Sequence, residues 1–216
     1  NSGNWLAISV GLSLALCLAP AQPFAQAKRS CDEIEAFMRN AKMKALNQLI
    51  AVMDDGSMQH RVFVNSNDES NASFPEPGAR YRDTWKANVA AYEVARLLEI
   101  SIMPPYVEGR VEGKAASLSW GLDDVIMDDV QRQQRNAQPP DLEAWNKQMH
   151  VVRVFDELIY DGRAPSDLLI TKDWQAWIIG PSQGFRPSKT IQHPENLVKI
   201  DRKLLAQEFE DLFEVS

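Results

Sequence analysis

Charge is missing from the N-terminal part of this sequence. Residues 1–27 contain no Asp, Glu, Lys or Arg, although charged residues make up 25% of the chain. Residues 5–19 form an apolar run that is too short, and too closely followed by Pro20, for a comfortable membrane-spanning helix. Ala25-Gln26-Ala27 has the small-x-small pattern that signal peptidases recognise. The pattern predicts a cleaved signal peptide over 1–27 and a periplasmic or extracellular protein. The alternative is an uncleaved membrane anchor at residues 5–19.

Cysteine, histidine and net positive charge are also scarce. The 2 cysteines cannot build a disulfide scaffold or a four-thiolate zinc site. The 3 histidines, His60, His150 and His193, lack the i, i+4 spacing that would pair two metal ligands on a helix. A net charge of -7 and a pI near 5.0 argue against nucleic-acid binding through a broad basic face. No nucleic-acid partner is therefore expected.

What remains is a chain of ordinary globular composition. Its 216 residues suffice for one domain or two small lobes, and 44% of them are hydrophobic. Helices are expected over 32–46, 84–98 and 123–135, from Asp141 onward, and from about residue 201. Strands are expected over 49–53, 58–64, 106–110, 115–120, 168–171 and 174–179. Because strands dominate the first half and helices the second, the order predicts an α+β fold with two lobes.

Two of these helices have an apolar stripe. In the first, the i, i+4, i+7, i+8 spacing predicts a buried face made of Ala90, Val94, Leu97 and Leu98. In the second, Asp141 is a candidate N-cap. The spacing of that helix predicts a core stripe of Trp145, Met149, Val152, Phe155 and Ile159.

Three segments resemble the atypical kinases, which include casein-type secretory-pathway kinases, HipA-type bacterial kinases and, more distantly, phosphoinositide kinases. Residues 88–98, followed by Pro104-Pro105, match the helix pattern x-x-Ala-Ala-Tyr-x-x-x-Arg-Leu-Leu. Residues 149–160 resemble the helix before the catalytic loop of that family, and 168–174 resemble the hairpin after it. The resemblance spans about 32–210. It implies a two-lobed kinase-like fold over 28–216, with a small β-rich N-lobe at about 32–120 and a helical C-lobe at about 121–216.

The same resemblance suggests catalytic-loop residues. The family has Asp-Arg-x-x-Gly-Asn between the long helix and the following strand, and this chain has residues 161–167 there. The resemblance implies Asp161 as the catalytic base, with Arg163 beside it, and Asp167 as a metal ligand. The loop is short and its spacing differs by one residue. These acidic side chains are alternatively the solvated residues of an ordinary capped loop.

Other family positions carry different residues. Gly180 stands where the family has a second metal-binding Asp, and glycine has no carboxylate. No glycine-rich phosphate loop precedes Leu49. The strand that should contain the phosphate-binding Lys has only Arg61, and Asn88 stands where the family often has the paired Glu. Arg61 and Asn88 are therefore the candidate nucleotide-binding residues.

These departures favour a pseudokinase, a kinase fold with degraded catalytic motifs that acts as a binding or regulatory module for a protein partner. No cofactor is expected in this interpretation. The alternative is an active atypical Ser/Thr kinase that uses ATP and Mg²⁺, with Asp161 as base and Asp167 as metal ligand. A third interpretation is a degenerate gene product without a selected function.

Overall fold

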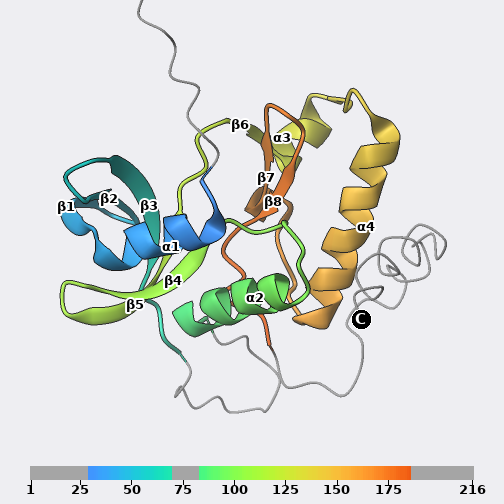
Figure 1. The fold of residues 1–216 in the computed structure, drawn as a ribbon. Coiled ribbons are helices and arrows are strands. Elements are labelled where there is room, and N and C mark those ends of the chain that lie inside the picture. The colour runs from blue at the N-terminus through green and yellow to red at the C-terminus, as the bar shows by residue number, and fades with distance from the viewer. Residues whose placement is uncertain (1–28, 70–82, 186–216) are drawn as a thin grey trace, which may run out of the picture.

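The computed structural model describes residues 29–69 and 83–185 (Figure 1). Its elements, in chain order, are α1 (Cys31–Asn40), β1 (Lys42–Asn47), β2 (Ile50–Asp54), β3 (Gln59–Asn65), α2 (Trp85–Leu97), β4 (Tyr106–Val111), β5 (Lys114–Trp120), β6 (Val125–Asp128), α3 (Asp129–Gln134), α4 (Leu142–Leu158), the 3₁₀ turn η1 (Pro165–Asp167), β7 (Leu168–Thr171) and β8 (Ala176–Ile178). The fold is α+β, as the order of elements predicts. None of the helices in the described ranges is long and apolar enough to cross a membrane. The expected segment 1–27 and the expected helix near residue 201 lie outside these ranges.

A five-stranded antiparallel sheet occupies one side of the molecule, in the order β1-β2-β3-β5-β4 (Figure 1). Along β3 buried and exposed side chains alternate, as expected for a strand with one face of the sheet covered. His60, Val62 and Val64 are buried, whereas Arg61 and Phe63 are exposed. The strands expected over 49–53 and 58–64 are confirmed as β2 and β3, which form an antiparallel hairpin. Its turn is stabilised by Asp55, whose Oδ1 accepts the amides of Ser57 and Met58, both at 2.8 Å.

Helix α1 packs on β4 and β5 and is shorter than the sequence predicts. It begins in a capping box, where Ser30 Oγ accepts the Glu33 amide at 3.2 Å and Glu33 Oε2 accepts the Ser30 amide at 2.8 Å. It ends at Asn40, because Ala41 already has an extended backbone. The expected helix over 32–46 is therefore wrong beyond Asn40. Residues 42–47 instead form β1, since their backbone groups pair with β2.

A three-stranded antiparallel sheet, β6-β7-β8, lies on the other side of the molecule with α3 and α4 (Figure 1). The expected helix over 123–135 is wrong in its first half, because residues 125–128 pair with β7 and only 129–134 are helical. Helix α4 is confirmed. Asp141 caps it by accepting the Ala144 amide at 3.0 Å, and Trp145, Val152 and Phe155 are buried along one face.

The buried face of α2 differs from the expected stripe. Its buried side chains are Trp85, Ala87, Asn88, Ala91, Tyr92 and Ala95. Leu97, predicted to be buried, is 82% exposed, and Ala90 is also exposed. The buried face therefore combines three alanines with Asn88 and two aromatic side chains, and it is rotated around the helix relative to the expected stripe.

The buried apolar side chains form two clusters. One joins α1 to the large sheet and includes Phe37, Met38, Val62 and Leu118. The other joins α2 to α4 and the small sheet, and it includes Tyr92 and Tyr106 with side chains from α4, β7 and β8. Helix α2 therefore packs into the second cluster although it follows β3 in sequence, and it also lies beside β4 and β5 of the large sheet (Figure 1).

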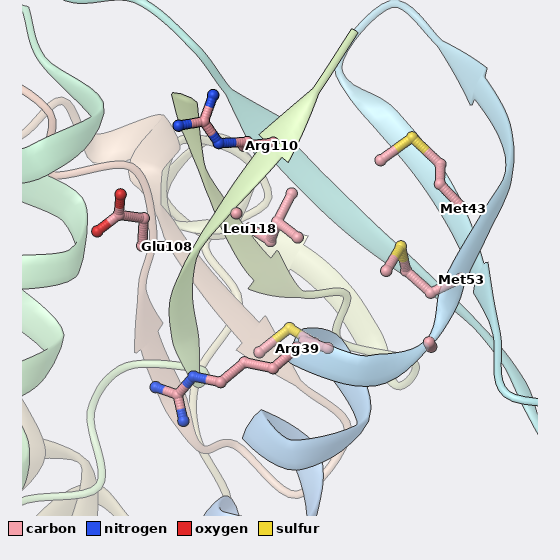
Figure 2. Close-up of a pocket in the computed structure, with 9 residues that line it drawn as sticks. Arg39, Met43, Met53, Glu108, Arg110 and Leu118 are labelled. Atoms are coloured by element: carbon pink, nitrogen blue, oxygen red, sulfur yellow. The ribbon is translucent and has the colours of Figure 1, made fainter. Parts of the chain in front are cut away.

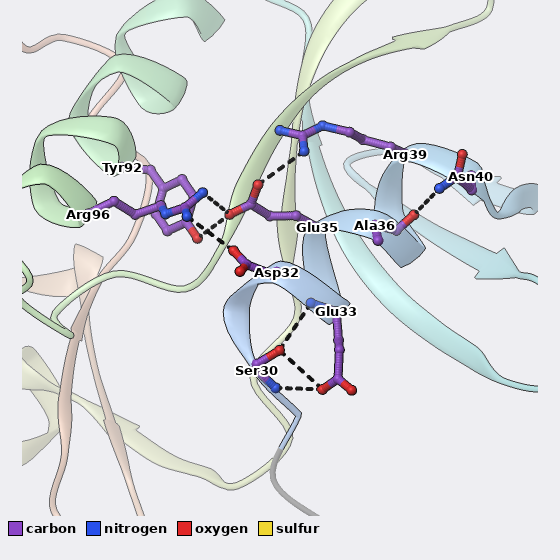
Figure 3. Close-up of polar contacts among 9 residues, drawn as sticks. All are labelled: Ser30, Asp32, Glu33, Glu35, Ala36, Arg39, Asn40, Tyr92 and Arg96. Carbon is purple, nitrogen blue, oxygen red and sulfur yellow. Dashed lines mark hydrogen bonds and ion pairs between the residues drawn. The ribbon is translucent and has the colours of Figure 1, made fainter.

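A buried carboxylate connects α1 to α2 across the two clusters (Figure 3). Glu35 is 3% exposed. Its Oε1 accepts hydrogen bonds from Tyr92 Oη at 2.8 Å and Arg96 Nη1 at 2.7 Å, and its Oε2 lies 3.1 Å from Arg39 Nη1. Burial and the neighbouring carboxylate raise the pKa of Tyr92, so its hydroxyl stays a hydrogen-bond donor.

Replacing Glu35 should therefore destabilise the protein strongly. We expect Glu35→Ala to lower the free energy of unfolding by about 3 kcal/mol, because it removes the acceptor of a buried hydroxyl and the partner of two guanidinium groups. The matched control is Asp32→Ala, which removes the other carboxylate on Arg96 but has an 82% exposed side chain. It should cost no more than about 1 kcal/mol. Urea unfolding of both variants tests this, and equal losses would contradict it.

His60 of β3 contacts Trp120, at the end of β5, and Gly121, which follows it. The His60 ring stacks on Trp120, with ring centroids 3.3 Å apart and planes at 6°. His60 Nε2 lies 2.8 Å from the Gly121 carbonyl, and because a carbonyl only accepts, Nε2 is the protonated nitrogen. Burial lowers the pKa of His60. The hydrogen bond to Gly121 and the charge of Asp123 oppose that shift, while Arg61 and Arg29 reinforce it.

This burial predicts a pH dependence of stability. Because the pKa of His60 is lower in the folded state, the unfolded chain takes up the proton first as the pH falls below about 6.5. The free energy of unfolding should then decrease toward low pH, by at most about 1.4 kcal/mol per pH unit for this one group. Urea titrations between pH 5 and 8 on the unaltered chain and on His60→Gln isolate the contribution, since other groups titrate in both proteins. Parallel pH profiles would refute it.

Candidate functional site

The loop after α4 contains the side chains that the sequence suggests for catalysis. Asp161 is 7% exposed, and its amide donates to the Asp156 carbonyl at 2.8 Å, which, with the positive φ of Tyr160, closes the C-terminal end of α4. Arg163 turns back onto the same helix. Its Nη2 lies 3.0 Å from Asp156 Oδ2, and its Nε lies 3.2 Å from the same oxygen. The loop is therefore held to α4 by a two-point ion pair.

This ion pair is largely buried, with side-chain exposures of 11% for Arg163 and 16% for Asp156. Burial raises the pKa of Asp156, and the guanidinium of Arg163 opposes that shift. Arg163 is thus engaged in stabilising a buried carboxylate that the sequence analysis did not consider. The two residues lie seven positions apart, on either side of the end of α4, and this spacing is not a known ion-pair pattern that the sequence could have indicated.

Asp167 lies at the end of η1, directly beside the end of β8. Its backbone carbonyl accepts the Ile179 amide at 2.9 Å, which places it next to Gly180. Its Oδ1 accepts the Ser166 hydroxyl at 3.2 Å. The structure therefore brings together Asp167 and Gly180, the two positions at which the resemblance implies metal ligands.

At Gly180 a tyrosine from the other sheet makes a polar contact. The Gly180 amide donates to the hydroxyl of Tyr106 at 3.0 Å, and Tyr106 is 3% exposed. Burial raises the pKa of Tyr106, while hydrogen bonds with Gly180 and the Ser119 hydroxyl lower it, and the charge of Asp167 contributes a further increase. The phenol is therefore neutral and bridges β4 of the large sheet to the end of β8.

Asn88 is a buried residue of α2 that faces the large sheet. It is 1% exposed, and its Nδ2 donates to Ser117 Oγ on β5 at 3.0 Å. Its Oδ1 is buried and has no hydrogen-bond partner in the described part of the chain. Asn65 lies opposite Ser117 on β3, so two amide side chains flank this serine.

Arg61 lies at the other end of β3 and points to solvent. Its Nη2 is 3.7 Å from Asp123 Oδ1, and both side chains are more than half exposed, so the pair contributes little stability. The carbonyl of Arg61 accepts the Gly121 amide at 3.0 Å. A Cβ on Gly121 would lie 2.7 Å from that carbonyl oxygen, so only glycine permits this close approach.

The strand register separates Arg61 from Asn88. Asn88 binds Ser117, which pairs with Asn65, and Arg61 lies four residues earlier on β3. At about 3.3 Å per residue this corresponds to about 13 Å along the strand. The two candidate nucleotide-binding residues are therefore not brought together. Ser117 instead contacts α2, and Tyr106 contacts Ser119 and Gly180. Sequence reasoning missed these residues because alternating polar residues are common in any strand.

Among residues 29–69 and 83–185, no three His, Cys, Asp or Glu side chains form a group that could hold a metal ion. Asp167 is the acidic side chain beside Gly180, and glycine adds no oxygen from a side chain. A scan of the chain against protein-family models gives no match, and a search of curated proteins gives none either.

The Arg163–Asp156 pair yields a testable consequence. Arg163→Met should lower the free energy of unfolding by about 3 kcal/mol, because it leaves a buried carboxylate without its cation. The double variant Arg163→Met with Asp156→Asn should recover at least half of that loss, since no buried charge is left unpaired. Chemical denaturation measures both. If Arg163→Met unfolds at the same denaturant concentration as the unaltered chain, Arg163 is not a structural residue.

Proposed function

We propose that this chain is a kinase-fold protein that does not transfer phosphate efficiently and that acts as a binding or regulatory module. The arrangement of elements supports the two-lobed interpretation: a five-stranded antiparallel sheet has a helix, α2, inserted between β3 and β4, and a long helix, a short loop and a hairpin follow. This order agrees with the resemblance of residues 88–98, 149–160 and 168–174 to the atypical kinases.

The observation that carries the proposal is the hydrogen bond at Gly180. In the kinase-like family this position supplies a carboxylate to Mg²⁺, and Mg²⁺ requires near-octahedral oxygen ligands. Here the position has no side chain, and its amide donates to the buried Tyr106 hydroxyl. A position that would contribute to metal binding instead joins the two sheets.

The nucleotide side of the site supports the same proposal. The β1–β2 connection is a two-residue turn, Gln48-Leu49, because Asn47 already pairs with Ile50. The Leu49 carbonyl accepts the Val64 amide at 2.7 Å, which holds the turn against β3. A turn of this length cannot fold over the phosphates of a nucleotide, which kinases cover with a glycine-rich loop. Arg61 and Asn88 lie too far apart to replace it.

One observation favours the active-kinase alternative. The backbone bond from Ile179 to Asp167 places an acidic side chain beside Gly180, and Asp161 lies six residues earlier in the same loop. In this alternative Asp161 is the base and Asp167 is a metal ligand. Because Gly180 has no carboxylate, a Mg²⁺·ATP complex would need further oxygen ligands from another group.

Nucleotide titration distinguishes the two functions. We expect millimolar ATP with Mg²⁺ or Mn²⁺ to leave the melting temperature of the purified chain unchanged and to give no autophosphorylation. A ligand at 100 times its Kd would stabilise the folded state by about 2.7 kcal/mol, which is about 5 °C or more for a chain of this size. A metal-dependent shift of that size, or incorporation of labelled phosphate, would overturn the proposal.

Gly180 offers a matched gain-of-function control. Its φ of 61° is accessible to Asp and Asn, and a Cβ there would meet nothing within 4 Å. Gly180→Asp should add a carboxylate beside Asp167 and produce Mn²⁺-dependent stabilisation, whereas the uncharged Gly180→Asn should not. Equal metal responses in the two variants would show that the missing carboxylate is not what limits metal binding.

A further inference from the structure

A hollow beside the C-terminal end of α1 does not by itself indicate a ligand (Figure 2). It has a volume of about 200 Å³ and opens onto the apolar cluster beneath α1. Its charged lining residues have opposite signs: Arg39 is paired with the buried Glu35, and Glu108 points away from the methionines. This combination favours no class of occupant. A surface of α4 is more informative, because the chain itself contains a segment that matches it.

Helix α4 has a second apolar stripe beside its buried face. Val151, Val154 and Leu158 follow one another at i, i+3 and i+7, and Lys147 lies four residues earlier on the same line. At 100° per residue these four side chains, here called the outer stripe, lie about 110° around the helix from the centre of the buried face. Leu158 is 58% exposed, and the other three are half-buried. In Figure 1 α4 lies at the edge of the described elements and packs on β8, so these elements cover the outer stripe only in part.

The described chain ends at this same helix. Its last residue is Phe185, whose amide donates to the carbonyl of Ile159, the C-cap residue of α4. Residues 186–216 therefore start from the end of α4 at which Leu158 lies. The connection 186–200 can extend to about 50 Å, which is twice the length of about 25 Å that α4 spans. Any point on the outer stripe is therefore within reach of the residues that follow 200.

The sequence after residue 200 has an apolar pattern that matches the outer stripe. The helix expected from about residue 201 has Leu205, Phe209 and Leu212 at i, i+4 and i+7, which predicts one apolar face. A helix over 201–213 would be about 20 Å long, and Lys147 and Leu158 are separated by about 17 Å along α4. The apolar face of the segment and the outer stripe are therefore similar in length.

The charges of the two helices are complementary. Residues 204–216 contain four acidic side chains and no basic one. On α4, Lys147 forms none of the ion pairs found within residues 29–69 and 83–185, not even with the exposed Glu143 one turn earlier. Its methylene groups can lie along the apolar stripe while the ammonium group stays at the edge. An acidic segment on the stripe would supply the carboxylate that Lys147 lacks, in a contact that salt weakens.

We propose that residues 201–213 dock as an amphipathic helix on the outer stripe of α4, with their apolar face against Val151, Val154 and Leu158. The covalent connection favours this occupant over a separate partner, because a segment tethered through 186–200 has an effective concentration of about a millimolar. Burial of apolar side chains on both helices stabilises the contact. The inference goes beyond the proposed function and does not depend on whether the chain binds nucleotide.

Disulfide formation between introduced cysteines tests the contact in the full chain. Val154→Cys places one thiol at the centre of the outer stripe. Glu208→Cys places the other beside Phe209 and leaves the apolar face of the segment intact. The matched control combines Val154→Cys with Glu210→Cys, which removes the same charge at nearly the same tether length but lies about 160° away around the helix. Both native cysteines are replaced by serine.

The expected result is a difference in rate between the two cysteine pairs. In a glutathione buffer at micromolar protein, the 154/208 pair should form an intramolecular disulfide at least about tenfold faster than the 154/210 pair, because a disulfide requires the two Cβ atoms to face each other. Alkylation followed by mass spectrometry measures both rates. In concentrated urea the two rates should become equal, since only the length of the connection then matters.

Further variants separate the apolar and the charged contributions. Phe209→Ser in the 154/208 background removes the largest apolar side chain of the segment and should lower the rate to that of the 154/210 pair. Lys147→Glu should slow the reaction about threefold, whereas Arg135→Glu makes the same change of charge at an exposed residue after α3 and should leave the rate unchanged. Circular dichroism identifies any variant that does not fold, and the Lys147 and Arg135 variants then supply the comparison.

Three outcomes would overturn the proposal. Equal rates for the two cysteine pairs in native buffer would leave the outer stripe to a separate partner. A rate advantage that survives Phe209→Ser would show that the apolar face does not hold the segment. Disulfide-linked dimers that increase with protein concentration, with a dimer in sedimentation, would assign the segment to the α4 of a second copy. The proposed function is tested separately by the nucleotide titration, whose result does not affect any of these rates.

Discussion

The carboxylate of Glu35 sets the arrangement of the molecule. A charge that is 3% exposed must have partners, and here they are Tyr92 and Arg96 of α2 together with Arg39 of its own helix. The network fixes α2 against α1. A second contact holds the N-terminal end of α2, because the amide of its N-cap residue Thr84 donates to the carbonyl of Ser182 in the loop after β8. Because these two contacts hold both ends of α2, Asn88 in the middle of the helix lies against Ser117 of β5.

The side chains at the candidate site are used mainly to hold elements of the fold together. Three of the candidate positions make structural contacts: Arg163 with Asp156, Gly180 with Tyr106, and Asn88 with Ser117. These contacts join different elements and do not converge on a shared point. Under the proposed function, loss of the catalytic groups would leave no buried charge unpaired, so the fold could be kept while its surfaces served binding.

The sequence predicts the elements whose formation depends on residues close together in the chain, such as turns, capping residues and apolar stripes. The β2–β3 hairpin follows from the turn around Asp55, and α4 follows from its capping residue and the spacing of Trp145, Val152 and Phe155. Strand β1 was missed because its residues suit a helix equally well until they pair with β2, a non-local contact. The buried face of α2 differs from the expected apolar stripe because Asn88 and Tyr92 make buried polar contacts with Ser117 and Glu35, which lie far away in the sequence. The Tyr106–Gly180 bond spans 74 residues and has no local pattern.

The separation of α1 from its partners in sequence also determines when it can form. Its contacts lie on β4 and β5 and, through Glu35, on α2, at distances of 57 and 61 residues for Tyr92 and Arg96. A ten-residue helix is only marginally stable in isolation. During synthesis from the N-terminus, α1 must therefore wait, with Phe37 and Met38 unpacked, until more than half of the chain has emerged. The first helix in the sequence is therefore secured only after α2, β4 and β5 have been made.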